Sequence, residues 1–291
     1  MEVLALRRAF DPEVMDAVWA AVEPRIPIPV DTHPLRGHRR RKSNRACFEV
    51  MLVRLGTGCS SEDAERLCAK LVSDTTVRSR REEWIRAGVF DDVLAEALAG
   101  YDKIIGLSLD DVAVDGSLHK IPCGSEGTGK NPTDGGKLGW KWSILTDSNG
   151  VPIGVAIDGA NRNDSVLLAP TLDDAKAKGL FEDIETIWLD RGYDSDATRQ
   201  RLKEREITDA IIAKKRKRGA AKAVKNNQPM GLRWPVERTN SWLSNFGQLR
   251  RNTDRRNVHR LAQFALAVVF LLTAKLIDWR NRWSLAPLPI R

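Results

Sequence analysis

Cysteine, histidine and tyrosine are all scarce in this chain. Its 291 residues include four Cys, four His and two Tyr. No two of the cysteines form a Cys-x-x-Cys pair, which argues against a zinc site and, in so long a chain, against a disulfide framework. We expect all four to be small core hydrophobes in a reducing compartment. They are Cys47, Cys59, Cys68 and Cys123.

Targeting and membrane-spanning signals are equally scarce. Met1–Arg8 already carries Glu and Arg residues and has no long apolar core, so it does not predict a signal peptide. One apolar run, Leu261–Trp279, is nearly long enough to cross a bilayer, but Gln263, Lys275 and Asp278 interrupt it. We therefore expect a helix buried in a soluble, cytoplasmic protein that has no membrane partner.

Positive charge is in excess. Lys and Arg number 47 against 39 Asp and Glu, which gives a net charge of +8. The basic residues gather in three runs, Arg36–Lys42, Lys214–Arg218 and Arg250–Arg256, and clustered cations favour a nucleic-acid partner over a set of solvated loops. The candidate DNA contacts in these runs are Arg39, Arg40, Arg41, Lys42, Lys214, Lys215, Arg216, Arg250 and Arg251.

The first hundred residues have helical patterning. Short helices joined by tight Gly or Ser turns resemble a helix-turn-helix module, so residues 1–100 are expected to form an all-α DNA-binding domain. Its reading helix would carry Arg78, Arg80, Arg81 and Arg86 on a basic surface. The alternative is a small helical bundle with a charged exterior. Helices are expected at Pro12–Val22, Ala46–Leu55, Glu62–Leu71, Thr75–Ala87 and Asp91–Leu98.

Period-two alternation marks the rest of the chain as an α/β domain over residues 101–291. Strands are expected within Leu107–Ser117 and at Lys141–Leu145, Val151–Ile157, Ile184–Leu189 and Ile207–Ala213, with helices at Asp164–Leu180, Asp196–Glu206 and Pro235–Phe246. A strong hairpin turn, Asp147–Gly150, joins the second and third strands. Three strands followed by alternating helices and strands predict a mixed sheet with flanking helices.

Three carboxylates stand at equivalent points of this pattern. Asp115 ends the first strand, Asp190 ends the fourth, and Glu237 lies in the first turn of the helix after the fifth. If the first and fourth strands lie side by side, the three can converge. Such oxygen ligands suit Mg²⁺ or Mn²⁺, and two ions roughly 3.5–4 Å apart are the arrangement used by nucleases. Alternatively, Asp190 only caps a turn and Glu237 only benefits from a helix N-terminus.

Other polar residues compete for these roles. Asp111 shares a strand face with Asp115 and is a minor candidate, whereas Asp164 and Asp194 are expected to be caps or turn residues. The stretch Gly124–Lys130 resembles a P-loop but lacks the following Ser or Thr, so we reject a nucleotide site. His119 and Lys120, just past Asp115, are expected either to contact phosphate or to be solvated. Arg233, four residues before Glu237, could touch a scissile phosphate or hold Glu237 in place.

Three motifs carry a family resemblance. They are Val112–Ser117 around Asp115, Leu189–Asp194 around Asp190, and Arg233–Leu243 around Glu237. Together with Leu55–Cys59 and Trp84–Phe90 in the helical region, they resemble bacterial DDE transposases of the insertion-sequence-five group, within the IS4/IS5-like superfamily.

The resemblance implies a ribonuclease H-like catalytic fold. It also implies that Asp115, Asp190 and Glu237 bind two divalent metals, cut transposon ends and join them to a target. Arg233 matches the Arg of the family's helix motif, but Met230 and Ser244 stand where that motif has Tyr and Lys. Two ends must be held together, so a homodimer on DNA near the nucleoid is expected. The alternatives are a regulator of the same fold without chemistry and a nuclease that cuts without joining.

Overall fold

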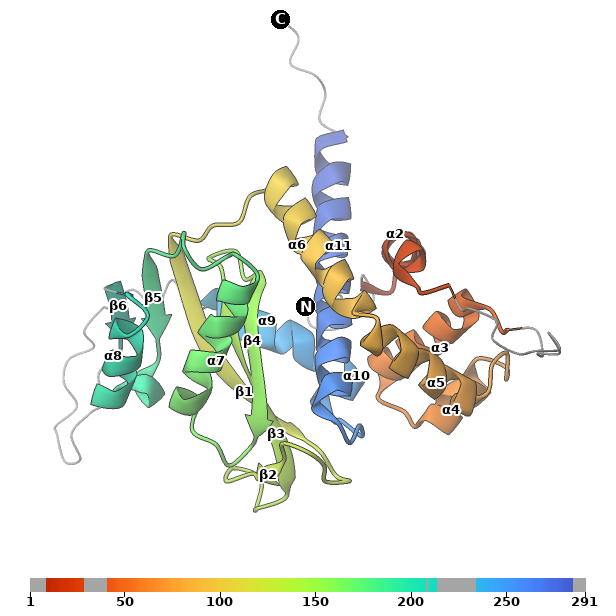
Figure 1. Cartoon of the computed structure of the whole chain (residues 1–291), viewed down its shortest axis with the longest axis horizontal. Coiled ribbons are helices and arrows are strands. Elements are labelled where there is room, and N and C mark those ends of the chain that lie inside the picture. The colour runs from red at the N-terminus through yellow and green to blue at the C-terminus, as the bar shows by residue number, and fades with distance from the viewer. Residues whose placement is uncertain (1–8, 29–40, 208, 214–233, 285–291) are drawn as a thin grey trace, which may run out of the picture. The chain divides into compact units, whose positions relative to one another are not determined.

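The structure, a computed structural model, describes residues 9–28, 41–207, 209–213 and 234–284 (Figure 1). The chain divides into two compact units: a helical unit formed by residues 1–105 together with 243–291, and a sheet unit formed by residues 106–242. The expected second domain, 101–291, differs from this division at its C-terminal end. The reason is that the last helix packs against the N-terminal helices of the helical unit.

The helical unit contains the N-terminal helices that the sequence predicts, with shifted ends. Side chains cap several of these helices at the N-terminus: Asp11 accepts a hydrogen bond from Glu13 N, and Ser60 accepts one from Asp63 N. The helices of this unit are α2 (Pro12–Val22), the 3₁₀ turn η1 (Glu23–Arg25), α3 (Asn44–Thr57), α4 (Ser61–Leu67), α5 (Asp74–Arg86), α6 (Val89–Ile104), α10 (Gly247–Arg250) and α11 (Asn257–Ser284).

Helix α11 contains the long apolar run. It is the one helix among the described residues that is long and apolar enough to cross a membrane, but 61% of its most apolar stretch is buried inside the protein. It packs against α6 and α2, and its buried residues extend from His259 to Ala274. This agrees with the expected buried helix, because burial within a folded unit removes the apolar face from water as a bilayer would.

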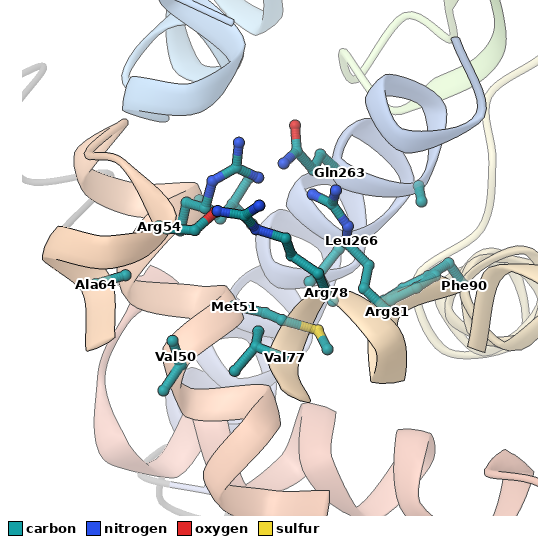
Figure 2. Close-up of a pocket in the computed structure, with 13 residues that line it drawn as sticks. Val50, Met51, Arg54, Ala64, Val77, Arg78, Arg81, Phe90, Gln263 and Leu266 are labelled. Carbon is teal, nitrogen blue, oxygen red and sulfur yellow. The ribbon is translucent and has the colours of Figure 1, made fainter. Parts of the chain in front are cut away.

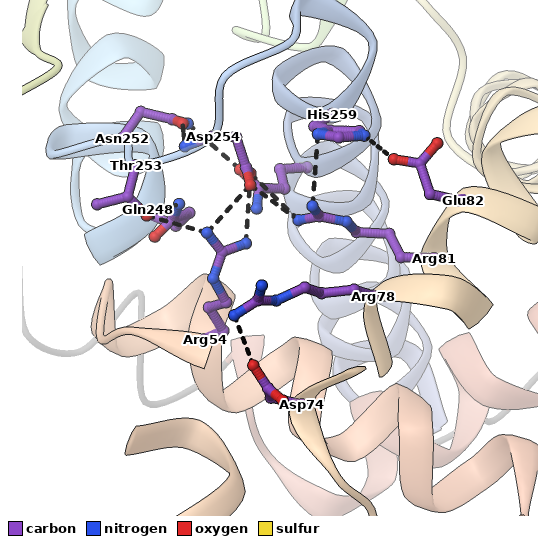
Figure 3. Close-up of polar contacts among 11 residues, drawn as sticks. Arg54, Asp74, Arg78, Arg81, Glu82, Gln248, Asn252, Thr253, Asp254 and His259 are labelled. Carbon is purple, nitrogen blue, oxygen red and sulfur yellow. Dashed lines mark hydrogen bonds and ion pairs between the residues drawn. The ribbon is translucent and has the colours of Figure 1, made fainter. Parts of the chain in front are cut away.

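A polar cluster lies inside the helical unit (Figure 3). The Asp254 carboxylate accepts hydrogen bonds from Arg54 Nη2 at 3.0 Å and from Arg81 Nη1 at 3.0 Å. Burial alone would raise the pKa of Asp254, but the guanidinium groups of Arg81 and Arg54 outweigh it and hold this pKa below its usual value. His259 on α11 pairs with Glu82 on α5. The cluster therefore ties the segment before α11 to α3 and α5.

The sheet unit contains a mixed sheet in the order β2-β3-β1-β5-β6, with β4 pairing to β3. Its β1 pairs antiparallel to β3 and parallel to β5, so the expected neighbourhood of the first and fourth predicted strands is confirmed. The strands are β1 (Asp111–Lys120), β2 (Gly129–Lys130), β3 (Leu138–Thr146), β4 (Pro152–Gly159), β5 (Thr186–Leu189) and β6 (Asp209–Ile212). The helices are α7 (Asp164–Ala177), η2 (Arg191–Tyr193), α8 (Asp196–Lys203) and α9 (Trp234–Ser244).

Helices contact both faces of this sheet. The Thr171 hydroxyl of α7 donates to Ser143 Oγ of β3 at 2.9 Å, whereas Asn240 Oδ1 of α9 accepts from Trp142 Nε1 at 2.7 Å. Because consecutive residues of a strand point to opposite faces, α7 and α9 lie on opposite sides of β3. Figure 1 shows α7 in front of the sheet.

Candidate active site

Asp115 and Asp190 lie level with each other on neighbouring parallel strands. The register pairs Ala113 with Trp188, so each acid stands two residues beyond this pair. Asp190 directly follows the last residue of β5, as expected. Asp115 does not end its strand, because β1 continues to Lys120 along β3. The strands are about 4.8 Å apart, and paired residues share a face, so both carboxylates belong to one side of the sheet edge.

The turn after β5 fixes the Asp190 side chain. Its Oδ1 accepts a hydrogen bond from Gly192 N at 2.6 Å, so the capping role is present. Tyr193, at the end of this turn, is buried. Burial raises the pKa of its hydroxyl well above the usual value, and the carboxylates of Asp164, Asp115 and Asp190 add to this effect. The acids therefore create a shared region of negative potential beside the turn.

Helix α9 is bound to the β3–β4 turn by consecutive residues. Arg238 Nη2 donates to Asn149 O at 2.7 Å, and Thr239 Oγ1 donates to Gly150 O at 2.7 Å. Gly150 has a φ of +75°, and a Cβ there would lie 2.8 Å from Thr239 Oγ1 and 3.0 Å from Pro235 O. The Asp147–Gly150 turn therefore both closes the hairpin and lets α9 approach closely.

Asn240 links α9 to the first acid. Its Nδ2 donates to Asp115 Oδ2 at 3.0 Å, while its Oδ1 accepts from Trp142 Nε1. Glu237 lies three residues earlier on the same helix, so the two side chains share one face of α9. Glu237 is exposed.

The three carboxylates fit a divalent cation by the chemistry of their donor atoms. They offer oxygen donors alone, which suit Mg²⁺ or Mn²⁺. Two are level on adjacent strands, and the third lies one helical turn from the residue that binds Asp115. Within the described part of the chain, no three His, Cys, Asp or Glu side chains are grouped closely enough to hold one metal ion.

The competing acids have partners of their own. Asp111 Oδ1 accepts from Trp188 Nε1 at 2.8 Å, and Asp194 pairs with Arg199. Asp164 Oδ1 lies 2.8 Å from Lys141 Nζ. Asp194 is the C-cap of the turn η2, as expected. The N-cap of α7 is Asn163, so the capping role expected of Asp164 is not observed.

His119 is neither exposed nor solvated, contrary to the expectation from sequence. It is 6% exposed and its ring stacks on Trp142. Burial lowers the pKa of His119 to about 3. Lys120, by contrast, is exposed, with its Nζ 3.6 Å from Asp134.

The basic surface predicted for α5 is wrong at Arg80 and Arg81. Arg80 is 5% exposed and binds Asn44, and the Arg81 side chain is 13% exposed and binds Asp254 (Figure 3). Arg81 and Arg54 also line a cavity of about 30 Å³, room for roughly one water molecule (Figure 2). Arg78 and Arg86 are exposed, and Arg78 pairs with Asp74.

The other candidate DNA contacts divide into two groups. Arg41 and Lys42 are exposed, with Arg41 paired to Glu83, and Arg250 and Arg251 are exposed. A second group lies outside the described residues: Arg39, Arg40, Lys214, Lys215, Arg216 and Arg233, together with Met230.

Reasoning from the sequence missed the roles of Asn240 and Trp142, and it placed Gly150 in the hairpin turn without its contact to α9. The sequence does contain one indication of a role for Asn240: it lies three residues after Glu237, on the polar face of a predicted helix. Its partner Trp142 lies 98 residues away in the chain, and nothing local marks that contact.

Comparison with protein families identifies the class. Residues 107–272, more than half of the chain, match the family described as "Transposase DDE domain", and the chain belongs to this family. Residues 14–94 match a second family, described as "Putative transposase of IS4/5 family". The chain is thus an IS4/IS5-like member, and membership implies dependence on divalent metal in general.

Two curated relatives agree with this family. The chain is 38% identical over 135 residues to a putative transposase for insertion sequence element IS402 of Burkholderia cepacia, covering 44% of this chain and 60% of that protein. It is 37% identical over 78 residues to the transposase for insertion sequence element IS1106 of Neisseria meningitidis serogroup B, covering 27% of this chain and 25% of that protein. The matched part of the chain therefore spans less than two thirds of either relative.

Two solved structures are distantly similar. One is a piggyBac transposase synaptic complex with hairpin DNA, with a TM-score of 0.43 and 12% identity, covering 97% of this chain and 76% of that chain. The other is a Mos1 transposase paired-end complex, with a TM-score of 0.26 and 10% identity, covering 86% of this chain and 82% of that chain. At these TM-scores neither likeness carries an argument about this chain.

Proposed function

We propose that this protein is a transposase that binds the ends of its own insertion sequence and catalyses metal-dependent cleavage and strand transfer of double-stranded DNA. One observation carries the proposal: Asp115 and Asp190 stand level on adjacent parallel strands, and Asn240 ties Asp115 to the helix that carries Glu237. Family membership and the excess of basic residues support it.

The reaction has two displacement steps at phosphorus. In the first, water attacks the phosphate at the element's end, the bond to the 3′-oxygen breaks, and a 3′-hydroxyl is released. In the second, that hydroxyl attacks a phosphate of the target, whose own 3′-oxygen leaves. Two bound Mg²⁺ or Mn²⁺ ions would activate the attacking oxygen and stabilise the leaving one. Asp115, Asp190 and Glu237 provide the carboxylate oxygens that hold these ions.

The mixed sheet supports assignment of a ribonuclease H-like fold to the catalytic part. We assign residues 1–100 as the DNA-binding part, with α4 and α5 as a helix-turn-helix-like pair. The exposed residues Arg41, Lys42 and Arg78 are its proposed DNA contacts.

The remaining basic residues are assigned from the sequence and from exposure. Arg250 and Arg251 are proposed to bind the phosphate backbone, and they are exposed. Arg233 is proposed to contact the scissile phosphate, because it lies four residues before Glu237. Arg39, Arg40, Lys214, Lys215 and Arg216 are proposed from charge alone. A homodimer would hold the two ends together in a cytoplasmic, nucleoid-bound complex.

The test uses DNA that contains the ends flanking the gene for this protein. The full chain is incubated with this DNA in Mg²⁺ and in EDTA, beside Asp190→Asn. We expect metal-dependent nicks at the ends in the wild type and none in the variant, with DNA binding retained in both. Products joined to a target DNA would distinguish a transposase from a nuclease. Binding of the ends without cutting would instead indicate a regulator, and Ser244, at the position of the family's Lys, would be the first residue to change.

A further inference from the structure

We propose that Asn240 is a positioning residue of the acidic site: its side-chain amide holds the Asp115 carboxylate and fixes α9, and with it Glu237, against the sheet. This inference rests on the proposed function, because it concerns the carboxylates assigned there.

The orientation of the Asn240 amide follows from its partners. The indole N–H of Trp142 can only donate, so the atom that faces it at 2.7 Å has to be Oδ1. The Nδ2 group then faces Asp115 Oδ2 at 3.0 Å, where it donates to a carboxylate, which can only accept when charged. Exchanging the two amide atoms would set donor against donor and acceptor against acceptor. Asn240 is 7% exposed, so water offers little substitute for either bond.

Trp142 is a rigid anchor for this amide. It is fully buried. The His119 ring stacks on it with ring centroids 3.5 Å apart and planes inclined by 21°, and Trp140 meets it edge to face at 5.3 Å. An indole clamped on two sides cannot rotate its N–H away, so it fixes the position of Asn240 Oδ1.

Helix α9 passes this constraint on to Glu237. Arg238 and Thr239 bind the β3–β4 turn, and Asn240 binds β1 and β3. The Arg238 guanidinium is also held between Trp234 and Trp242, at 4.4 and 4.6 Å from their ring centroids. Of these contacts, the Asn240 amide alone connects α9 directly to an acid of the site.

A carboxylate that accepts one N–H still has lone pairs for a cation. Removing a residue that hydrogen-bonds to a metal ligand and so orients it typically lowers metal affinity or activity by roughly 10- to 100-fold. We expect Asn240→Leu, which has similar volume and neither hydrogen-bonding group, to slow cleavage of end DNA by this factor. It should also raise the Mn²⁺ concentration needed for half-maximal cleavage.

A second variant separates positioning from folding. Asn240→Leu leaves the Trp142 N–H buried without its partner, which by itself lowers stability. In the double variant Asn240→Leu with Trp142→Phe no buried donor is left unpaired, so the stability lost to the unpaired N–H should recover, less the packing that the smaller Phe ring gives up. Cleavage should stay low in the double variant, since Asp115 still lacks its donor.

The measurements are thermal unfolding, cleavage rate against Mn²⁺, and Mn²⁺ bound to the protein–DNA complex by electron paramagnetic resonance. Asn281→Asp, an exposed change on α11, is the matched control and should behave as the wild type. Cleavage and Mn²⁺ binding that recover together with stability in the double variant would overturn the inference. So would an Asn240→Leu protein that cleaves at the wild-type rate. A wild type that fails to cut would instead overturn the proposed function.

Discussion

His119 lies flat on Trp142, with the ring centroids 3.5 Å apart, and it is buried on β1, the strand that also carries Asp115. Burial lowers its pKa to about 3, so this imidazole is neutral in the folded protein at any pH near neutrality. In the unfolded chain the same imidazole becomes protonated below about pH 6.5.

This pair predicts a pH dependence of stability. Between about pH 6.5 and pH 3 the unfolded state binds one more proton at His119 than the folded state does. The free energy of unfolding should therefore fall as pH falls, by about 1.4 kcal/mol per pH unit from this group. His119→Phe, which keeps an aromatic ring on Trp142, should remove that slope. Urea unfolding at pH 7.5, 6 and 5 measures it, and an unchanged slope in the variant would rule out a neutral buried His119.

Asp254 should contribute more to the stability of the helical unit than an exposed acid does. Asp254→Asn leaves the guanidinium groups of Arg54 and Arg81 buried without a counter-charge, and breaking a buried pair in this way destabilises by about 3–5 kcal/mol. Glu62→Gln breaks an exposed pair with Arg66 on α4 and should change stability by less than about 1 kcal/mol. Chemical unfolding of both variants provides the comparison, and equal effects would contradict a buried network.

The contribution of Asp254 to the free energy of unfolding also depends on pH. Its pKa is lowered in the folded protein, so its stabilisation is present above its ordinary pKa of 3.8 and is lost as pH falls through the lower, folded value. The wild type should lose this stabilisation below about pH 4, whereas Asp254→Asn should not.

Gly150 should affect the cleavage rate as well as stability, because α9 packs closely against it. Gly150→Ala strains a residue whose φ is +75° and brings a methyl group within 2.8 Å of Thr239 Oγ1, so α9 has to shift. Gly179→Ala has a similar φ of +71° but meets nothing within 4 Å. Both variants should lose about 1–2 kcal/mol of stability from the left-handed backbone, but only Gly150→Ala should also slow cleavage, by tenfold or more. Equal cleavage rates in the two variants would mean that the turn does not position α9.

Five of the six described strands were predictable because their signals are local, whereas the two-residue strand β2 was not predicted. Alternation, the Asp147–Gly150 turn and the acid directly after the run Thr186–Leu189 are each contained within about ten residues. The order of elements allowed β1 and β5 to be neighbours, but only the structure established that they pair.

Burial of charged residues was not predictable, because it depends on distant partners. Arg81 reads as part of a basic helix face, yet its partner Asp254 lies 173 residues further along the chain. Asp254 itself belongs to a C-terminal segment that packs with the N-terminal helices, so both the domain boundary and the Arg81 assignment depended on the same long-range contact.

Substituting the exposed residues Arg250 and Arg251 should affect DNA binding, whereas substituting a buried arginine should affect stability. Both are exposed, and if they neutralise DNA phosphates, Arg250→Ala and Arg251→Ala should each reduce the slope of log K against log salt by about 1, with stability unchanged. Arg81→Ala should instead destabilise the helical unit, because it leaves Asp254 with one guanidinium fewer. Binding titrations at several salt concentrations, beside thermal unfolding, measure both effects. A salt slope that stays at the wild-type value in the Arg250 and Arg251 variants would remove these residues from the DNA interface.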